Sequence, residues 1–200
     1  MVNKYLGRWV AMVKLGFIGE GANEKTVLES ANFRALLNKL GLGFIENVID
    51  AEGGGNLLPK HLEDQIDSLK KEGATDILIL TDQEDAPCIS SVKSRIDPDG
   101  NHIVVIAVRA IEAWFLADNN AMSAYLKSRF ICKNPEEFIR PFDQIKKLRW
   151  EKRGRGLNHK KLLCSHMLLN GFSIQNAANH PNCPSAKYFL NKLKSLAEAE

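Results

Sequence analysis

Hydrophobic positions in the first 118 residues follow two alternating periods. Short runs rich in β-branched residues predict strands at 12–18, 44–50, 76–81 and 103–108. Between these runs, apolar residues recur at helical spacing and predict helices at 26–40, 56–71 and 89–96. Strands that alternate with helices in this order are typical of βαβ units and a parallel sheet.

The runs at 76–81 and 103–108 are almost entirely apolar, rather than alternating between apolar and polar residues. Continuous apolar runs are typical of strands that are covered on both faces. We therefore expect an α/β fold with a four-stranded, mostly parallel, doubly wound (Rossmann-like) sheet.

After residue 109 the strand signals end and helical spacing dominates. Helices are predicted at 111–117, 121–130, 135–150 (interrupted by Pro141), 160–170 and 186–199. No Gly-, Ser- or Pro-rich linker separates them from the first part. We expect an α/β core over 1–118 and a C-terminal helical extension over 119–200 that packs on this core.

The composition is that of an ordinary globular chain. Of 200 residues, 44% are hydrophobic and 26% are charged, which excludes a disordered or collagen-like chain. The chain has no CxxC pair and no run of about 18 apolar residues, so we expect reduced thiols, no membrane span and a cytoplasmic location. The four cysteines are Cys88, Cys132, Cys164 and Cys183.

Acidic residues follow three of the predicted strands. Because the carboxyl ends of parallel strands meet at one edge of a sheet, these acids are expected to gather there. Carboxylates that cluster without a countercharge repel one another, and a hard divalent cation such as Mg²⁺ or Mn²⁺ relieves that repulsion. The bland alternative is that they are helix caps and solvated loop charges, for example Glu24 near a helix start. The acids are Glu20, Glu24, Asp82, Glu84, Asp85 and Glu112.

Two of these groups form a spaced pattern, Glu20-Gly21-x-x-Glu24 and Asp82-x-Glu84. The pattern resembles the TOPRIM domain of topoisomerases, bacterial primases and overcoming-lysogenization-defect nucleases, and the spacing of the two glutamates is closer to the nuclease branch. Glu84 stands where the family has aspartate, which could shift the ligand role to Asp85.

Segments 109–118 and 183–190 resemble parts of small, uncharacterised TOPRIM-like bacterial proteins that are suspected of roles in phage-defence or mobile-element loci.

The resemblance implies Mg²⁺- or Mn²⁺-dependent phosphodiester chemistry on DNA or RNA, with a nuclease as the leading expectation. Glu20, Asp82 and Glu84 are then the catalytic residues, with Glu20 in acid–base work or metal ligation. The implied metal ligands are Glu20, Asp82, Glu84, Glu24, Asp85 and Glu112. Arg109 is a candidate phosphate contact, and its alternative is an ion pair with Glu112.

Residues 144–161 form a basic segment that overlaps the end of the helix predicted at 135–150. Eight cations and one acid give it a charge of +7, and because the whole chain carries +3, the remainder carries −4. We predict a basic loop here that binds nucleic acid, with Trp150 as a stacking surface. Its cations are Lys146, Lys147, Arg149, Lys152, Arg153, Arg155, Lys160 and Lys161.

Three alternatives stay open. Glu84 in place of aspartate favours a non-catalytic nucleic-acid or nucleotide binding module with a vestigial metal site. A phosphoacceptor receiver domain would use Asp82, but a clear lysine after the next strand is missing. A zinc site built from Cys164-x-His166 and His180-x-x-Cys183 has spacings that zinc sites rarely use.

Overall fold

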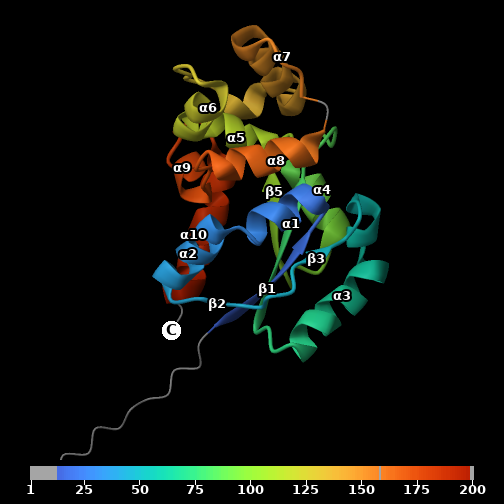
Figure 1. The fold of residues 1–200 in the computed structure, drawn as a ribbon. Helices are drawn as coiled ribbons and strands as arrows, with labels where there is room; N and C mark the ends of the chain where they lie inside the picture. The colour runs from blue at the N-terminus through green and yellow to red at the C-terminus, as the bar shows by residue number, and fades with distance from the viewer. Residues whose placement is uncertain (1–12, 158, 199–200) are drawn as a thin grey trace, which may run out of the picture.

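The computed structural model describes residues 13–157 and 159–198, and it has an α/β fold (Figure 1). Its five strands form one sheet in the order β2-β1-β4-β5, with β3 paired beside β2 on the same edge of β1. Every pairing between these strands is parallel. The strands are β1 (Lys14–Gly19), β2 (Gly43–Phe44), β3 (Ile49–Asp50), β4 (Asp76–Asp82) and β5 (Ile103–Ala107).

The α/β class and the parallel sheet are confirmed, but the strand predicted at 44–50 is two short strands. β2 pairs with the start of β1, where Leu15 lies opposite Phe44, and β3 pairs with its end, where Ile18 lies opposite Ile49. Five strands therefore occupy four positions in the sheet. Residue 12, the first of the predicted strand 12–18, lies outside the described residues.

The helices of the first part are α1 (Ala22–Leu28), α2 (Ala31–Leu40), α3 (Pro59–Lys71) and α4 (Ile89–Ile96), and a 3₁₀ turn, η1 (Gly54–Leu57), precedes α3. The helix predicted at 26–40 is wrong as a single element. α1 ends at Leu28, and Ser30 caps α2, because its hydroxyl oxygen accepts a hydrogen bond from the backbone N of Phe33 at 3.2 Å.

The helices that follow the last strand are α5 (Glu112–Ala117), α6 (Asn119–Leu126), α7 (Pro141–Arg153), α8 (Lys160–Leu169), α9 (Ile174–Ala178) and α10 (Pro184–Glu198), with a 3₁₀ turn η2 at Pro135–Glu137. The predicted basic loop at 144–161 is largely helical, which corrects the prediction. Residues 144–153 belong to α7 and 160–161 begin α8. Between the two helices the structure describes 154–157 and 159.

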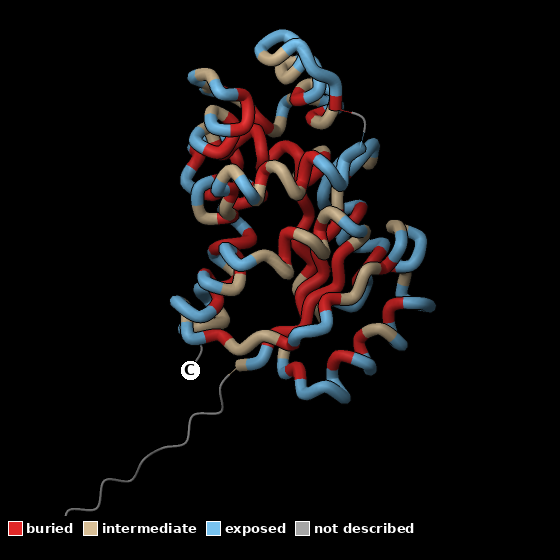
Figure 2. Tube along the Cα trace, in the orientation of Figure 1, coloured by how far each residue is buried: buried red, intermediate tan, exposed pale blue. Residues whose placement is uncertain are grey.

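Side chains that alternate along the strands bury two hydrophobic clusters, one on each face of the sheet. Leu15, Phe17 and Leu80 pack with α1, α2 and the helices of the extension. Ile18 and Ile79, on the other face, pack with α3 and α4. The doubly wound arrangement is therefore present, and the extension shares one continuous cluster with the sheet. Figure 2 shows the strands of the sheet as buried segments inside the molecule.

None of the helices formed by the described residues is long and apolar enough to cross a membrane.

Asp118 joins the helices of the extension to one another. It is 1% exposed and caps α6 through a hydrogen bond from the backbone N of Ala121 at 3.0 Å. Its second oxygen accepts from the backbone N of Ser173 at 3.2 Å and from Nδ2 of Asn176 at 3.1 Å, at the start of α9. One buried carboxylate thus satisfies three donors from two helices.

We expect Asp118→Ala to lower the free energy of unfolding by about 3 kcal/mol, because it leaves these buried donors without an acceptor. Asp118→Asn, which keeps one acceptor oxygen, is expected to lose less. Urea unfolding followed by circular dichroism measures both, with the exposed Asp64→Ala on α3 as the control. A loss at Asp118→Ala no larger than that of the control would contradict the assigned role.

Candidate functional site

Glu20 directly follows β1 and is held against the end of β4. Its backbone N donates to the carbonyl oxygen of Leu80 at 2.9 Å, which continues the ladder between the two strands. Its Oε2 accepts hydrogen bonds from the backbone N of Asp82, at 3.0 Å, and from the hydroxyl of Thr81. The carboxylate of Glu20 is thereby fixed beside the last residue of the neighbouring strand.

Asp82 is the last residue of β4. Its Oδ1 accepts a hydrogen bond from the backbone N of Ile111 at 2.8 Å, just before α5 begins. Burial raises the pKa of Asp82 well above its ordinary value, and the negative charges of Glu24, Glu112 and Glu20 raise it further. The end of β4 is therefore surrounded by other carboxylates.

Glu24 lies in the first turn of α1 and is buried. Its Oε2 accepts from the backbone N of Gly21 at 3.0 Å, so the helix-cap interpretation is confirmed for this residue. Burial, helped by the charges of Glu112 and Glu20, raises the pKa of Glu24 from 4.5 to about 7. Glu24 is thus both a cap and a member of the acidic group.

Gly19 allows α1 to approach β1 this closely. A Cβ at this position would lie 2.9 Å from the Cβ of Glu24 and 3.0 Å from the backbone N of Lys25. No larger residue fits without moving the helix. The position of Glu24 therefore depends on a glycine at the end of β1.

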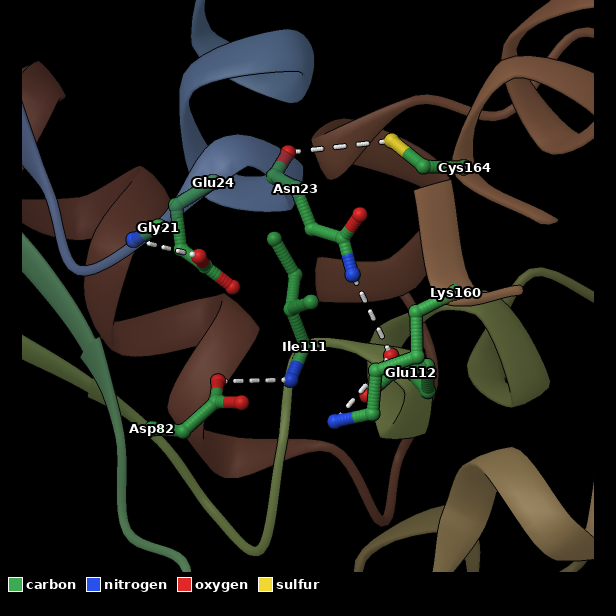
Figure 3. Close-up of polar contacts among 8 residues, drawn as sticks. All are labelled: Gly21, Asn23, Glu24, Asp82, Ile111, Glu112, Lys160 and Cys164. Atoms are coloured by element: carbon green, nitrogen blue, oxygen red, sulfur yellow. Dashed lines mark hydrogen bonds and ion pairs between the residues drawn. The ribbon is translucent and has the colours of Figure 1, made fainter. Parts of the chain in front are cut away.

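Glu112 is the first residue of α5 and is 1% exposed. Its Oε1 accepts from Nδ2 of Asn23 at 3.4 Å and lies 3.7 Å from Nζ of Lys160, as Figure 3 shows. Its Oε2 is buried and has no hydrogen-bond partner in the described part of the chain. Burial raises the pKa of Glu112 despite the ion pair with Lys160.

Lys160, at the start of α8, is the cation nearest to this group. Burial lowers the pKa of Lys160, but the negative charges of Glu112, Asp82 and Glu24 outweigh it and leave the pKa raised. Lys160 therefore stays protonated at neutral pH. It was predicted to bind nucleic acid, and in the structure it balances part of the acidic group.

Glu84 and Asp85 lie in the turn after β4 and are exposed, unlike Glu24 and Glu112. The backbone N of Glu84 donates to the carbonyl oxygen of Arg109 at 2.9 Å. Glu84 and Arg109 both adopt left-handed backbone conformations, with φ of 51° and 64°. Such conformations are unusual for residues with a side chain and often occur at functional sites.

A cavity of about 290 Å³ opens where these residues meet the extension. Five carboxylates and three cations line it, and residues 139, 141 and 142 add an apolar wall. Arg109 lies here without an ion pair to Glu112, whose partner is Lys160. The acids are Asp82, Glu84, Asp85, Glu112 and Asp143, and the cations are Arg109, Arg140 and Lys160.

The chemistry of these side chains suits a hard divalent ion, but their present arrangement does not form a metal site. They are carboxylates, the pKa values of Glu24 and Asp82 are raised by burial and further by the neighbouring negative charges, and one buried oxygen of Glu112 lacks a partner. Yet no group of three or more His, Cys, Asp or Glu side chains among residues 13–157 and 159–198 is arranged to hold a metal ion. Glu24, Asp82 and Glu112 would have to turn toward one another to share one.

Two of the predicted nucleic-acid contacts are used inside the protein. Nη1 of Arg149 donates to the hydroxyl of Tyr125 at 2.5 Å and lies 3.2 Å from Nδ1 of His166. Nη1 of Arg153 donates to the carbonyl oxygen of Tyr125 at 3.1 Å. These arginines fasten α7 to α6 and α8, a role that their place in a run of basic residues does not reveal.

The other cations of this segment remain exposed. Lys146, Lys147 and Trp150 line a shallow cavity of about 310 Å³ on α7, and Trp150 is 63% exposed. We call these three residues the α7 surface. Lys152, Arg155 and Lys161 are also exposed.

The residues of the possible zinc site make separate contacts. The thiol of Cys164 lies 3.6 Å from the carbonyl oxygen of Asn23, and that of Cys183 lies 3.4 Å from Oε1 of Glu136. His180 contacts the carbonyl oxygen of Cys132 through Nε2, at 2.9 Å. These contacts account for the residues without a metal.

Comparison of the chain with protein-family models, curated proteins and solved structures gave no match. The chemistry of the site is therefore argued from its own residues. The sequence did not indicate Thr81, Asn23 or Arg140 as members of the site, because each reaches it through a contact distant in the chain.

The raised pKa of Glu24 predicts that the metal-free protein loses stability as the pH rises. The folded chain holds this proton more tightly than the unfolded chain. The stabilising contribution is therefore complete below pH 4.5 and is lost as the pH rises through about 7. The difference is on the order of 3 kcal/mol. Urea unfolding between pH 4 and pH 8.5 in the presence of a chelator measures it.

Glu24→Gln provides the control, because it retains an acceptor for Gly21 and cannot titrate. Its stability should fall less between pH 5 and pH 8 than that of the wild-type protein. Identical pH profiles for the two proteins would contradict the raised pKa.

Proposed function

We propose that the chain is a Mg²⁺- or Mn²⁺-dependent enzyme that cleaves nucleic-acid phosphodiester bonds, a nuclease of the TOPRIM type. One observation carries the proposal: the ends of β1 and β4 and the first turns of α1 and α5 bring four carboxylates into mutual repulsion. A cluster of this kind is unfavourable unless a cation binds to it. The four are Glu20, Glu24, Asp82 and Glu112.

The residues that would hold the ion are Asp82, Glu24 and Glu112. Glu84 and Asp85, at the exposed side of the cavity, would supply further ligands. A divalent ion bound there would polarise the phosphate and neutralise the charge that develops during cleavage. Glu20 is fixed by Thr81 and the backbone of Asp82, and in this proposal it would accept a proton from an attacking water.

The cations that line the cavity suit a phosphate group. Arg109, which follows β5, and Arg140, which precedes α7, both line the cavity. Lys160 lines the same cavity and is held by Glu112, and its charge persists at neutral pH. A phosphodiester in the cavity would therefore lie close to three positive charges as well as to the carboxylates that would hold the ion.

The α7 surface supports a nucleic-acid substrate. Trp150 offers an exposed ring on which a base can stack, and the two lysines beside it can neutralise backbone phosphates. α7 also begins at the cavity, since Pro141 and Phe142 line it. One helix thus connects the surface to the site.

A non-catalytic nucleic-acid binding module is the second candidate. It is favoured by the arrangement of the acids, which do not form a metal cage, and by Lys160, which already compensates Glu112. The two candidates differ in whether Mg²⁺ or Mn²⁺ binds and whether turnover depends on it.

The proposal predicts that the purified protein with Mn²⁺ nicks or degrades DNA or RNA, and that Asp82→Asn lowers the rate at least 100-fold. Gel assays on labelled single- and double-stranded DNA and RNA measure cleavage, and calorimetry with MnCl₂ measures binding of the ion. Asp64→Asn, an exposed acid on α3, is the matched control.

Nucleic-acid binding without cleavage or Mn²⁺ binding would favour the binding module instead. Equal cleavage by the wild-type protein and Asp82→Asn would place the activity elsewhere.

For the α7 surface, we expect Lys146→Ala/Lys147→Ala to weaken nucleic-acid binding and to reduce the slope of log K against log salt by about 1.5. Trp150→Ala should weaken binding to single strands more than to duplexes, because stacking needs an unpaired base. Fluorescence anisotropy at several salt concentrations measures both effects. Lys70→Ala/Lys71→Ala on α3 is the matched control, and an equal change in that variant would remove α7 from the interface.

A further inference from the structure

The outer edge of β5 is unpaired in the described part of the chain. The sheet order ends at this strand, whose only partner is β4. β5 is longer than β2 and β3 at the opposite edge. Its residues 104–107 are all buried. An edge of this kind is a template for another strand unless something blocks it.

The hydrogen-bond pattern shows which backbone groups point outward. The backbone N of Gln83 donates to the carbonyl oxygen of Ala107 at 2.9 Å, and Asp82 lies opposite Ala107 in the parallel register. In a parallel pair only alternate residues bond to a given neighbour. The N–H and C=O groups of residues 103, 105 and 107 therefore face β4, and those of Val104 and Ile106 face away from the sheet.

Val108 supports this assignment. It has the same parity as Val104 and Ile106, and its backbone N donates outward to the hydroxyl of Ser185 at 3.3 Å, at the start of α10. The outward N–H of Val108 is thus satisfied within the protein. The outward N–H groups of Val104 and Ile106 face a groove.

This groove has a volume of about 460 Å³ and a helix along each wall. Ile89, Ser90 and Lys93 of α4 form one wall, and Pro184, Ser185 and Tyr188 of α10 form the other. The floor is the edge of β5 itself, at residues 104, 106 and 108. In Figure 1, β5 lies between these two helices.

The walls expose apolar side chains and carry positive charge. Ile89 is 49% exposed and Tyr188 is 40% exposed, and neither takes part in the proposed active site. Nζ of Lys192 lies 5.4 Å from the centre of the Tyr188 ring, and Lys93 lines the opposite wall. No carboxylate is among the described residues that line the groove.

We propose that this groove binds an extended segment of a partner protein as an additional strand on β5. The segment would pair with the outward N–H and C=O groups of Val104 and Ile106, place apolar side chains at alternate positions against Ile89 and Tyr188, and carry carboxylates near Lys93 and Lys192. Its main chain supplies hydrogen bonds, and its charges match the rim of the groove.

The charges favour such a partner over a second copy of this chain. Two copies paired through β5 would bring the same walls together, with Lys93 and Lys192 on both sides of the new interface. Like charges across an interface oppose association. An acidic segment would instead be attracted to Lys93 and Lys192.

The test uses a fluorescein-labelled peptide of alternating valine and threonine with two glutamates at each end. We expect the full chain to bind it, and Lys93→Glu/Lys192→Glu to weaken binding at least tenfold by fluorescence anisotropy. Lys70→Glu/Lys71→Glu on α3 should bind like the wild-type protein. A second peptide with lysines in place of the glutamates should bind at least tenfold more weakly.

Hydrogen exchange measured by NMR identifies the mode of binding. In the free protein the amides of Val105 and Ala107 should be protected, whereas those of Val104 and Ile106 should exchange faster. The peptide should protect Val104 and Ile106. This readout does not depend on catalysis, so it is separate from the proposed nuclease activity.

Absence of binding by the glutamate-flanked peptide overturns the proposal, as does binding that leaves Val104 and Ile106 unprotected. Protection of these two amides that grows with protein concentration in the absence of peptide, together with a dimer in sedimentation equilibrium, also overturns it and assigns the edge to a second copy.

Discussion

The parallel pairing of β1 with β4 is the constraint on which the site depends. Gly19 lies opposite Leu80 in that register, so each strand releases its next residues at the same edge of the sheet. The side chain of Glu20 then accepts hydrogen bonds from the last residues of β4, where the ladder between the two backbones ends. A shift in register would separate Glu20 from Asp82, because neither side chain reaches far along the sheet.

Contacts from the surrounding helices stabilise this acidic edge of the sheet. The backbone N of Ile111, just before α5, donates to Asp82, and Asn23 of α1 and Lys160 of α8 contact Glu112. Asp118 joins α6 to the start of α9. Fold stability and site chemistry are therefore coupled. Burial and the neighbouring negative charges raise the pKa values of Glu24 and Asp82, and the same two effects that weaken the metal-free fold at higher pH favour a divalent cation.

Much of the core was predictable from local pattern. The apolar runs located β1, β4 and β5, and therefore placed Glu20 and Asp82 at one edge, because strand ends and sheet direction follow from periodicity. The break at Ser30 was missed because the apolar stripe continues through it, whereas the hydroxyl of Ser30 competes for the backbone. The split of the second strand was missed because residues 44–50 carry no local mark of where pairing with β1 stops.

Contacts between distant segments could not be predicted in the same way. Arg149 and Arg153 lie in a basic run that favours solvent or nucleic acid, and only the position of Tyr125 on α6 shows that they face inward. The ion pair between Lys160 and Glu112 likewise joins residues far apart in the sequence. Charge composition predicts that cations are present, while tertiary packing decides which of them remain available.

The absence of a side chain at Gly19 has a consequence for the chemistry of its neighbours. Even a methyl group there would push the first turn of α1 away from the strand and carry Glu24 with it. The proton affinity of the acidic group would then change although no ionisable residue had been altered. A change of a few tenths of an ångström in the distance between β1 and α1 would thus alter the pKa values of the acidic group.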